Sequence, residues 1–362
     1  MLFLPFEAPL REATLRQRRD RFLADVALRE TGEADIAYCV NPGRMEAFSC
    51  AGARIWLLPA AARAGRRRLR WTWELIESGG VICGANTQRP NRIVGEALRR
   101  RVLPGLDDWT ELRSEARVPA AAEERQQAPS CSPVRGKTAP PRSRLDFWLR
   151  NSAGREHYVE VKNCHMVYPD GHGYFPDSVS SRASRHVSEL AELAEQGHLA
   201  TVIFVVVRGD IRGSVRPSRH HDPEFWRACH VAAARGVSFR AVVVSCAPGG
   251  LTLQREAPVD LAPYDPQDIA GWVRGNRLET GWIRSMSGRR VANGPFPHEA
   301  AVCPKRVRKA SAGKLSRARR VAKSATRRVL PTATLPSARM KNAVAFAFAL
   351  KPAPADVGPI EL

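Results

Sequence analysis

The sequence contains no Cys-x-x-Cys pair, and its eight cysteines are scattered between Cys39 and Cys303. That spacing argues against a zinc site and against a disulfide framework, because both show recognisable cysteine groupings. The chain also lacks an apolar run of membrane-spanning length, and no charged segment precedes a long apolar run at its N-terminus. We therefore expect a reduced, cytoplasmic protein that binds no membrane.

Acidic residues are few for the number of basic ones, and the formal net charge is +21. This excess predicts a polyanionic partner, and we expect nucleic acid, DNA in particular. The charge is uneven, because the chain as far as Pro263 carries only about +8, whereas residues 303–341 contain thirteen lysines and arginines and no acid. We predict that residues 261–362 form a basic, largely disordered extension that binds polyanions without reading their sequence. A non-functional extension is the alternative.

Length and turn signals divide the rest of the chain. The 362 residues are enough for two domains and a tail. In the N-terminal part, turn signals such as Asn41-Pro42-Gly43 and Ser78-Gly79-Gly80 separate short stretches that read as strands. Five short strands with no helix between them predict a small closed all-β barrel of the OB type over residues 1–88. The predicted strands are 22–28, 36–40, 54–58, 69–76 and 81–85.

A basic run followed by tryptophans lies within this predicted barrel. Arg66, Arg67 and Arg68 lead into Trp71 and Trp73. Barrels of this type bind single-stranded nucleic acid through basic grooves and stacked aromatic rings, so we predict contacts from the three arginines and from Trp71. Alternatively, the arginines form a solvated loop and one or both tryptophans belong to the barrel core.

The stretch 143–162 has the pattern of a β-hairpin. Leu145, Phe147 and Leu149 alternate with polar or aromatic residues, turn residues follow, and alternation resumes at residues 158–162. Because side chains two apart in a strand share a face, Glu160 and Lys162 point the same way. If the facing strand presents Asp146 beside them, two carboxylates and an amine converge on one point.

That convergence has a specific chemical meaning. Two carboxylates can hold Mg²⁺ or Mn²⁺ through oxygen, which leaves positions for water and phosphate, and a nearby ammonium can stabilise charge on the phosphate. An aspartate followed by Glu-x-Lys on the next strand is the pattern of the PD-(D/E)xK nucleases. We predict Asp146, Glu160 and Lys162 as catalytic residues, with Asp146 and Glu160 as metal ligands. A surface hairpin whose Glu160 and Lys162 pair in solvent is the alternative.

The elements around the hairpin follow the order of that nuclease fold. An apolar stripe predicts a helix over 91–101, residues 111–118 read as a strand, and a second helix is expected over 180–196. The uninterrupted apolar run 201–207 is typical of a strand buried on both faces. We therefore predict a PD-(D/E)xK-like α/β domain over residues 89–260, with a mobile insertion at residues 119–142.

Further candidates follow from their places in these elements. Glu96 on the first helix and Asp177 in the loop after the hairpin are possible additional acids, although Glu96 equally suits a solvated helix face. Basic side chains near the second helix and the hairpin are candidate phosphate contacts, with plain solvation as the alternative. These are Arg144, Arg182, Arg185 and His186. The run His220-His221-Asp222 falls between elements and is interpreted as a loop.

Motifs in a consistent order carry a family resemblance. They are Arg21–Val26, Asn41–Met45, Thr72–Leu75, Asn86–Thr87, Ser143–Phe147, Tyr158–Lys162, Gly173–Asp177 and Arg182–Leu190. The chain to about Asp260 resembles the sugar fermentation stimulation protein A family. The resemblance implies an OB-like domain, a nuclease-like domain and DNA binding linked to sugar metabolism.

The chain departs from the family pattern at three places. Asn41-Pro42-Gly43 stands in place of Asn-Thr-Gly, Asn163 follows Lys162 in place of serine, and Ala183–His186 replaces Gly-Gln-Lys-His. The three residues of the predicted catalytic set are retained, so the departures concern phosphate or substrate contacts.

Three functions fit this sequence. The leading one is a DNA-binding protein with a divalent-metal-dependent phosphodiesterase site. The second is a non-catalytic, sequence-nonspecific DNA-binding regulator that retains the nuclease fold as a scaffold. RNA processing through the barrel is the third. No small-molecule cofactor is indicated, and the oligomeric state stays open.

Overall fold

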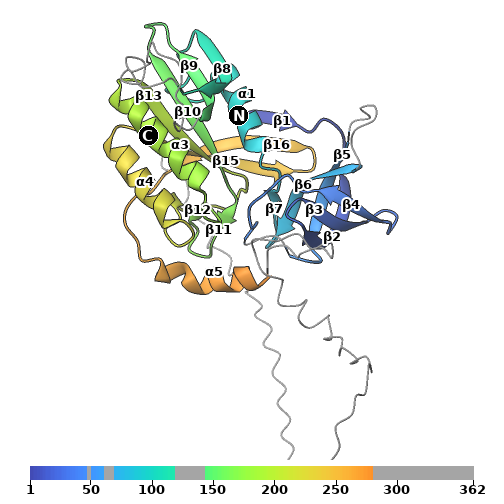
Figure 1. Ribbon diagram of the computed structural model, residues 1–362. Coiled ribbons are helices and arrows are strands. Elements are labelled where there is room, and N and C mark those ends of the chain that lie inside the picture. Colours follow the sequence, from blue (N-terminus) through green and yellow to red (C-terminus); the bar gives the residue numbers. More distant parts are fainter. Residues whose placement is uncertain (47–49, 61–68, 119–142, 280–362) are drawn as a thin grey trace, which may run out of the picture. The chain divides into compact units, whose positions relative to one another are not determined.

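The computed structural model of the chain describes residues 1–46, 50–60, 69–118 and 143–279 (Figure 1). The predicted contacts Arg66, Arg67 and Arg68, the insertion 119–142 and most of the basic extension lie outside these residues. The described chain contains a six-stranded sheet, a seven-stranded sheet and a small three-stranded sheet. In the part of the chain that the structure describes, no helix combines the length and the apolar character needed to cross a bilayer.

The six-stranded sheet closes on itself as a barrel. Its strands are β2 (Arg11–Arg19), β3 (Leu23–Leu28), β4 (Ala34–Tyr38), β5 (Arg54–Pro59), β6 (Trp71–Ser78) and β7 (Val81–Gly84). The order is β4-β3-β2-β5-β6-β7, and β4 also pairs with β6. Five strands therefore form the closed ring and β7 extends from β6, which confirms the predicted OB-like barrel.

One strand of the ring was not expected from the sequence. β2 carries five charged residues, so its pattern does not read as an apolar strand. Ala13 and Leu15 nevertheless point into the barrel core, and the register shifts between Leu15 and Gln17. Val81–Gly84, expected as a ring strand, instead forms a hairpin with β6. Pairing with β3 and β5 on both sides therefore decides the role of β2, in spite of its charges.

The seven-stranded sheet has the order β1-β16-β15-β13-β10-β9-β8. Its three central strands β10, β13 and β15 are parallel, and the outer pairs are antiparallel. The N-terminal strand β1 belongs to this sheet through β16 and not to the barrel. The strands are β1 (Leu2–Pro5), β8 (Glu111–Arg117), β9 (Arg144–Arg150), β10 (Glu156–Cys164), β13 (Leu199–Val206), β15 (Ser238–Ala247) and β16 (Gly250–Ala257).

Helices cover both faces of this sheet, which confirms the predicted α/β domain. Helices α3 (Ser181–Glu195) and α4 (Pro223–Ala234) lie side by side on one face (Figure 1). Helix α1 (Arg89–Arg99) covers the other, where Trp56 and Leu75 of the barrel join the same apolar cluster. The two domains therefore share this apolar cluster, while the barrel also has a core of its own. Burial of this apolar area is the main stabilising contribution to the fold.

The first part of the predicted disordered extension is ordered. Helix α5 (Gln267–Glu279) buries Ile269 and Val273 against an aromatic cluster of the small sheet. That sheet consists of β11 (Met166–Val167), β12 (Gly173–Phe175) and β14 (Val215–Pro217). The expectation of disorder is therefore wrong for residues 267–279. Long-range packing supplies apolar contacts there that the charged local sequence does not indicate. Trp272 also stacks on Tyr168, with ring centroids 6.2 Å apart.

Candidate active site

The β9–β10 ladder stops one residue before two acidic residues, Asp146 and Glu160. The last paired residues are Phe147 and Val159, and continuing that antiparallel register places Asp146 opposite Glu160. Beyond this point Oδ2 of Asp146 accepts a hydrogen bond from the backbone N–H of Val161 at 2.7 Å. Its Oδ1 accepts one from the side chain of Asn91 in α1 at 2.5 Å. The two strands fork at the acid pair, which we define as Asp146 and Glu160.

The second member of the acid pair is buried and only partly hydrogen-bonded. Glu160 is 4 % exposed, and its Oε1 accepts from Nζ of Lys162 at 2.6 Å. The same oxygen lies 2.6 Å from Nδ1 of His186 in α3. Oε2 is buried without a hydrogen-bond partner among the described residues. Leaving a buried charged oxygen unpaired costs about 1–3 kcal/mol or more, so this atom marks a place for a cation or a donor.

The two carboxyls differ in acidity. Burial raises the pKa of Asp146 to about 6, and the negative charge of Glu160 adds to the rise. The N–H of Val161, the charge of Lys162 and the amide of Asn91 oppose it. For Glu160, burial alone would raise the pKa, but Lys162 and His186 outweigh it and hold the pKa below its usual value. Glu160 therefore stays ionised, while Asp146 takes up a proton as the pH falls through about 6.

The oxygen ligands of the acid pair suit a metal ion whose remaining coordination positions are filled by water and substrate. Within the described residues, no three side chains of His, Cys, Asp or Glu lie together as a closed metal site. The acid pair offers carboxylate oxygens only, and Oε2 of Glu160 is free to accept. Mg²⁺ and Mn²⁺ are commonly held by one or two carboxylates together with water and phosphate oxygens. The residues present therefore fit an open site of that kind and do not fit a structural zinc site.

The two additional acids predicted from the sequence have other contacts. Glu96 pairs with Arg99 and Arg100 on its own helix. Asp177 is 8 % exposed, and its Oδ2 accepts from the backbone N–H of Met45 at 2.8 Å. Neither set of contacts involves the acid pair.

His186 was predicted as a phosphate contact, but it is 2 % exposed and faces Glu160. It therefore orients the acid, and its burial keeps it from contacting a phosphate on the surface. Arg144, Arg182 and Arg185 are exposed near the same end of the sheet, and Arg185 donates to Oγ of Ser143 at 3.1 Å. These three arginines remain available to a polyanion.

The two barrel tryptophans, Trp71 and Trp73, differ in burial, and each fits a different interpretation of the sequence. Trp73 is fully buried in the barrel core. Trp71 is half-buried, and its indole N–H donates to Asp35 at 2.7 Å. Core packing therefore explains Trp73, while Trp71 keeps part of its ring at the surface.

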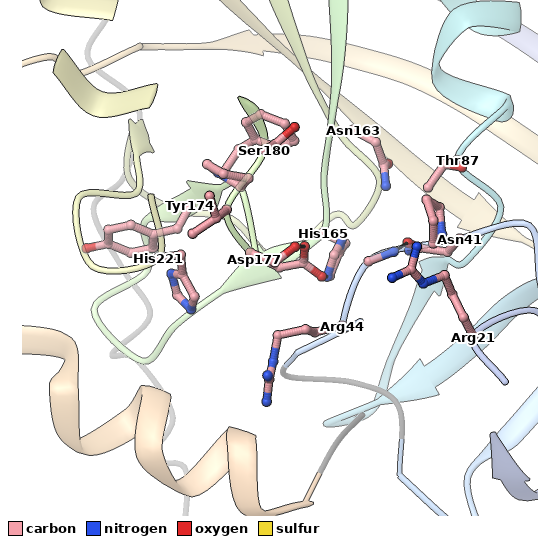
Figure 2. A pocket seen from close by; sticks show the side chains of 16 residues that line it. Arg21, Asn41, Arg44, Thr87, Asn163, His165, Tyr174, Asp177, Ser180 and His221 are labelled. Atoms are coloured by element: carbon pink, nitrogen blue, oxygen red, sulfur yellow. Dashed lines mark hydrogen bonds and ion pairs between the residues drawn. The ribbon is translucent and has the colours of Figure 1, made fainter. Parts of the chain in front are cut away.

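A pocket of about 690 Å³ opens beside the end of β10 (Figure 2). None of the three predicted catalytic side chains lines it, but Asn163, which follows Lys162 directly, does. Its other walls come from the barrel loop, which we define as residues 41–46, and from residues 174–180. The sequence showed both segments as motifs, although nothing in it indicated that they meet.

The sequence did not indicate the role of Glu46, a buried acid in the barrel loop. Glu46 is 0 % exposed, and its Oε1 accepts from the hydroxyl of Tyr168 and lies 3.0 Å from Nε2 of His221. His221, interpreted from the sequence as part of a loop, is thus a buried partner of the barrel. No local signal could have paired residues this far apart in the chain.

Comparison with known proteins agrees with both domains. Residues 17–85 match the SfsA N-terminal OB domain, and residues 119–250 match the sugar fermentation stimulation protein RE domain. A sugar fermentation stimulation protein homolog from Dinoroseobacter shibae is 36 % identical over 73 % of this chain and 98 % of its own length. The chain belongs to the sugar fermentation stimulation protein family. Its α/β domain is therefore restriction-endonuclease-like.

Other members of the sugar fermentation stimulation protein family are similarly related. The homolog from Thioalkalivibrio sulfidiphilus is 35 % identical over 72 % of this chain and 99 % of its own length. The solved structure of Pyrococcus furiosus SfsA in complex with Ca²⁺ aligns with a TM-score of 0.58. That alignment has 24 % identity and covers 72 % of this chain and 99 % of the other, so it supports the fold alone.

Proposed function

We propose that this protein is a divalent-metal-dependent phosphodiesterase that acts on DNA. The observation that carries the proposal is the buried, unpartnered Oε2 of Glu160 at the fork of β9 and β10, opposite Asp146. The nuclease-like fold and the Ca²⁺ complex of the archaeal relative support the same interpretation.

The residues of the site have different roles. Asp146, held by Val161 and Asn91, and Glu160, held by Lys162 and His186, would bind Mg²⁺ or Mn²⁺. When bound, such an ion polarises a phosphoryl oxygen and lowers the pKa of a coordinated water.

The ammonium of Lys162 has a separate role. It is 2.6 Å from Glu160 and only 7 % exposed, so its charge acts in a low-dielectric setting. There it stabilises the negative charge that develops on the phosphodiester or holds the attacking water. The neighbouring side chain of His186 positions Glu160 and does not need to reach the substrate.

The choice of DNA rests on charge and on the fold. Exposed Arg144, Arg182 and Arg185 lie near the acid pair, and the net charge of +21 favours a polyanion. The contribution of the basic extension is to affinity and not to sequence preference, because phosphate contacts carry no sequence information.

The test is cleavage of single-stranded and double-stranded DNA by the purified protein with Mg²⁺, Mn²⁺ or EDTA. We expect Mn²⁺- or Mg²⁺-dependent cleavage that falls by about 10²–10³-fold in Glu160→Gln and Lys162→Met, since each removes a charge at the reacting group. Glu96→Gln, an acid paired on its own helix, is the control and should retain cleavage.

A second function has one observation in its favour. The three predicted catalytic side chains do not line the pocket beside β10. This is expected of a non-catalytic DNA-binding regulator that keeps the nuclease fold as a scaffold. That function predicts salt-sensitive DNA binding with no metal-dependent cleavage. Equal behaviour of the wild type and Glu160→Gln in every metal would favour it and remove the phosphodiesterase.

A further inference from the structure

The pocket beside β10 has a rigid floor built from the barrel loop. Buried Arg18 donates to the backbone carbonyls of Asn41 and Arg44, and Asp177 accepts from Met45 across the domain junction. Gly43 approaches Asp177 so closely that a Cβ there would lie 2.8 Å from both carboxylate oxygens. The loop is therefore fixed from both domains, and the pocket is preformed.

Two polar groups in this pocket have no hydrogen-bond partner among the described residues. Asn41 is 2 % exposed, and its Oδ1 accepts from Gly43 while its Nδ2 is unpaired. The Oδ1 of Asn163 is unpaired as well. Figure 2 shows both asparagines on the side of the pocket that also carries Thr87 and Arg21. One unused donor and one unused acceptor are what the hydrogen-bonding edge of a nucleobase requires.

The remaining walls suit the other parts of a nucleotide. Flat or apolar side chains line one part, among them Pro42, Phe175, Pro176 and Val179. Val179 is 74 % exposed and offers an apolar contact to a ligand in the pocket. Arg21 and Arg44 supply positive charge. The volume of about 690 Å³ falls within the range of about 300–1,000 Å³ that is usual for ligand sites.

The pocket borders the strand and the helix that hold Glu160. Asn163 follows Lys162 on β10, and Ser180, which lines the pocket, caps the N-terminus of α3. That helix carries His186, the partner of Glu160. The pocket and Glu160 are therefore neighbours along β10.

We propose that this pocket binds the base and phosphate of one unpaired nucleotide of a DNA strand. The idea that this nucleotide belongs to the strand that is cleaved rests on the proposed phosphodiesterase function. A base within a duplex must leave its stack, at a cost of a few kcal/mol, before its hydrogen-bonding edge can enter such a site. The preferred substrate is therefore single-stranded DNA or a duplex with an unpaired end.

Binding without metal tests the pocket separately from catalysis. Fluorescence anisotropy of the full chain would be measured in EDTA at ~0.3 M salt, where phosphate contacts are weakened. The probes are a 20-nucleotide thymidine strand, the same strand with abasic sites throughout, and a 20-base-pair duplex. We expect the thymidine strand to bind most tightly.

Two variants locate that preference. Asn163→Ala removes an oxygen that makes no hydrogen bond in the free protein, and Val179→Glu adds a negative charge at an exposed pocket residue. Each should weaken binding of the thymidine strand by about fivefold or more. Asn163→Ala should leave the abasic strand nearly unchanged, whereas the charge of Val179→Glu should weaken binding of that strand too, because the strand keeps its phosphates. Val231→Glu adds the same charge at an exposed valine of α4, away from the pocket lining, and should behave as wild type.

The outcomes separate the two proposals. Tighter binding of the thymidine strand than of the abasic strand in EDTA, with no metal-dependent cleavage by the wild type, would leave the pocket intact without the phosphodiesterase. Equal affinity for the thymidine and abasic strands would overturn the pocket assignment, as would equal effects of Val179→Glu and Val231→Glu. Tighter binding of a 20-nucleotide uridine RNA strand would overturn the assignment to DNA.

Discussion

Two pairs of acidic residues in the described chain are held by different partners. In the pair Asp146 and Glu160, Oε2 of Glu160 has no partner among the described residues and the pKa of Asp146 is raised to about 6 by burial. In the pair Glu46 and Asp177, oxygens accept from Tyr168 and from the backbone of Met45, and Glu46 also lies close to His221 and Arg44. The hydrogen bonds of the second pair cross the domain boundary, whereas the first pair is held within the nuclease-like domain. Burial of an acid is therefore no mark of function by itself.

The second pair connects the two domains. Glu46 belongs to the barrel loop, whereas its partners Tyr168 and His221 belong to the nuclease-like domain. Asp177 makes the reverse connection to Met45. These contacts hold the wall of the pocket beside β10 in place. Glu46 and Asp177 therefore support the pocket.

Metal binding should separate the two pairs most clearly. Addition of Mn²⁺ at about 100 times its dissociation constant should stabilise the wild type by about 2.7 kcal/mol in thermal unfolding. Glu160→Gln should lose this gain, because it removes one charge and one oxygen ligand. Asp177→Asn should lower the starting stability but keep the gain. A metal response that vanishes in Asp177→Asn instead would place the ion at the domain junction.

Removing the buried acid of the barrel loop should act on stability. Glu46→Ala leaves Tyr168 and His221 without their acceptor, so we expect a loss of about 1–3 kcal/mol in the free energy of unfolding. Urea denaturation measures it. Glu224→Ala, which removes an exposed acid from α4, is the control and should stay within about 0.5 kcal/mol of wild type. Comparable losses for the two variants would contradict the structural role of Glu46.

A methyl group at Gly43 should loosen the same joint. Gly43→Ala places a Cβ against both oxygens of Asp177, and such overpacking costs about 1–3 kcal/mol. Gly249→Ala is the matched control, because a Cβ there meets nothing within 4 Å. Differential scanning calorimetry should show a lower Tm for Gly43→Ala only. An unchanged Tm would show that the barrel loop yields without strain.

A final prediction concerns pH. Burial, with a contribution from the charge of Arg208, lowers the pKa of His165 to about 4, although Asp177 opposes the shift. The unfolded chain takes up this proton near pH 6.5 and the folded protein only near pH 4, so stability is lost as pH falls between these values. His165 contributes up to about 1.4 kcal/mol per pH unit to that loss. In His165→Gln, denaturation midpoints measured from pH 7 to pH 4.5 should fall less steeply than in wild type.

Local pattern was sufficient for much of the architecture. Strand periodicity and the turn at Asn151–Gly154 predicted the hairpin, and β9 and β10 occupy it with Asp146 opposite Glu160. The helix expected at 180–196 differs from α3 by one residue at each end, because Ser180 caps it. The charged strand β2 was missed, since its place depends on neighbours that arrive later in the chain.

The sequence by itself determined the family and the barrel and nuclease-like domains, and it predicted that Glu160 and Lys162 share a strand face, because these depend on patterns within tens of residues. Only the tertiary structure decided that His186 turns inward to Glu160, that Glu46 joins the two domains, and that Asn41 and Asn163 share a pocket. Those contacts join residues far apart in the chain. Their geometry depends on how the sheets and helices pack, which no local periodicity encodes.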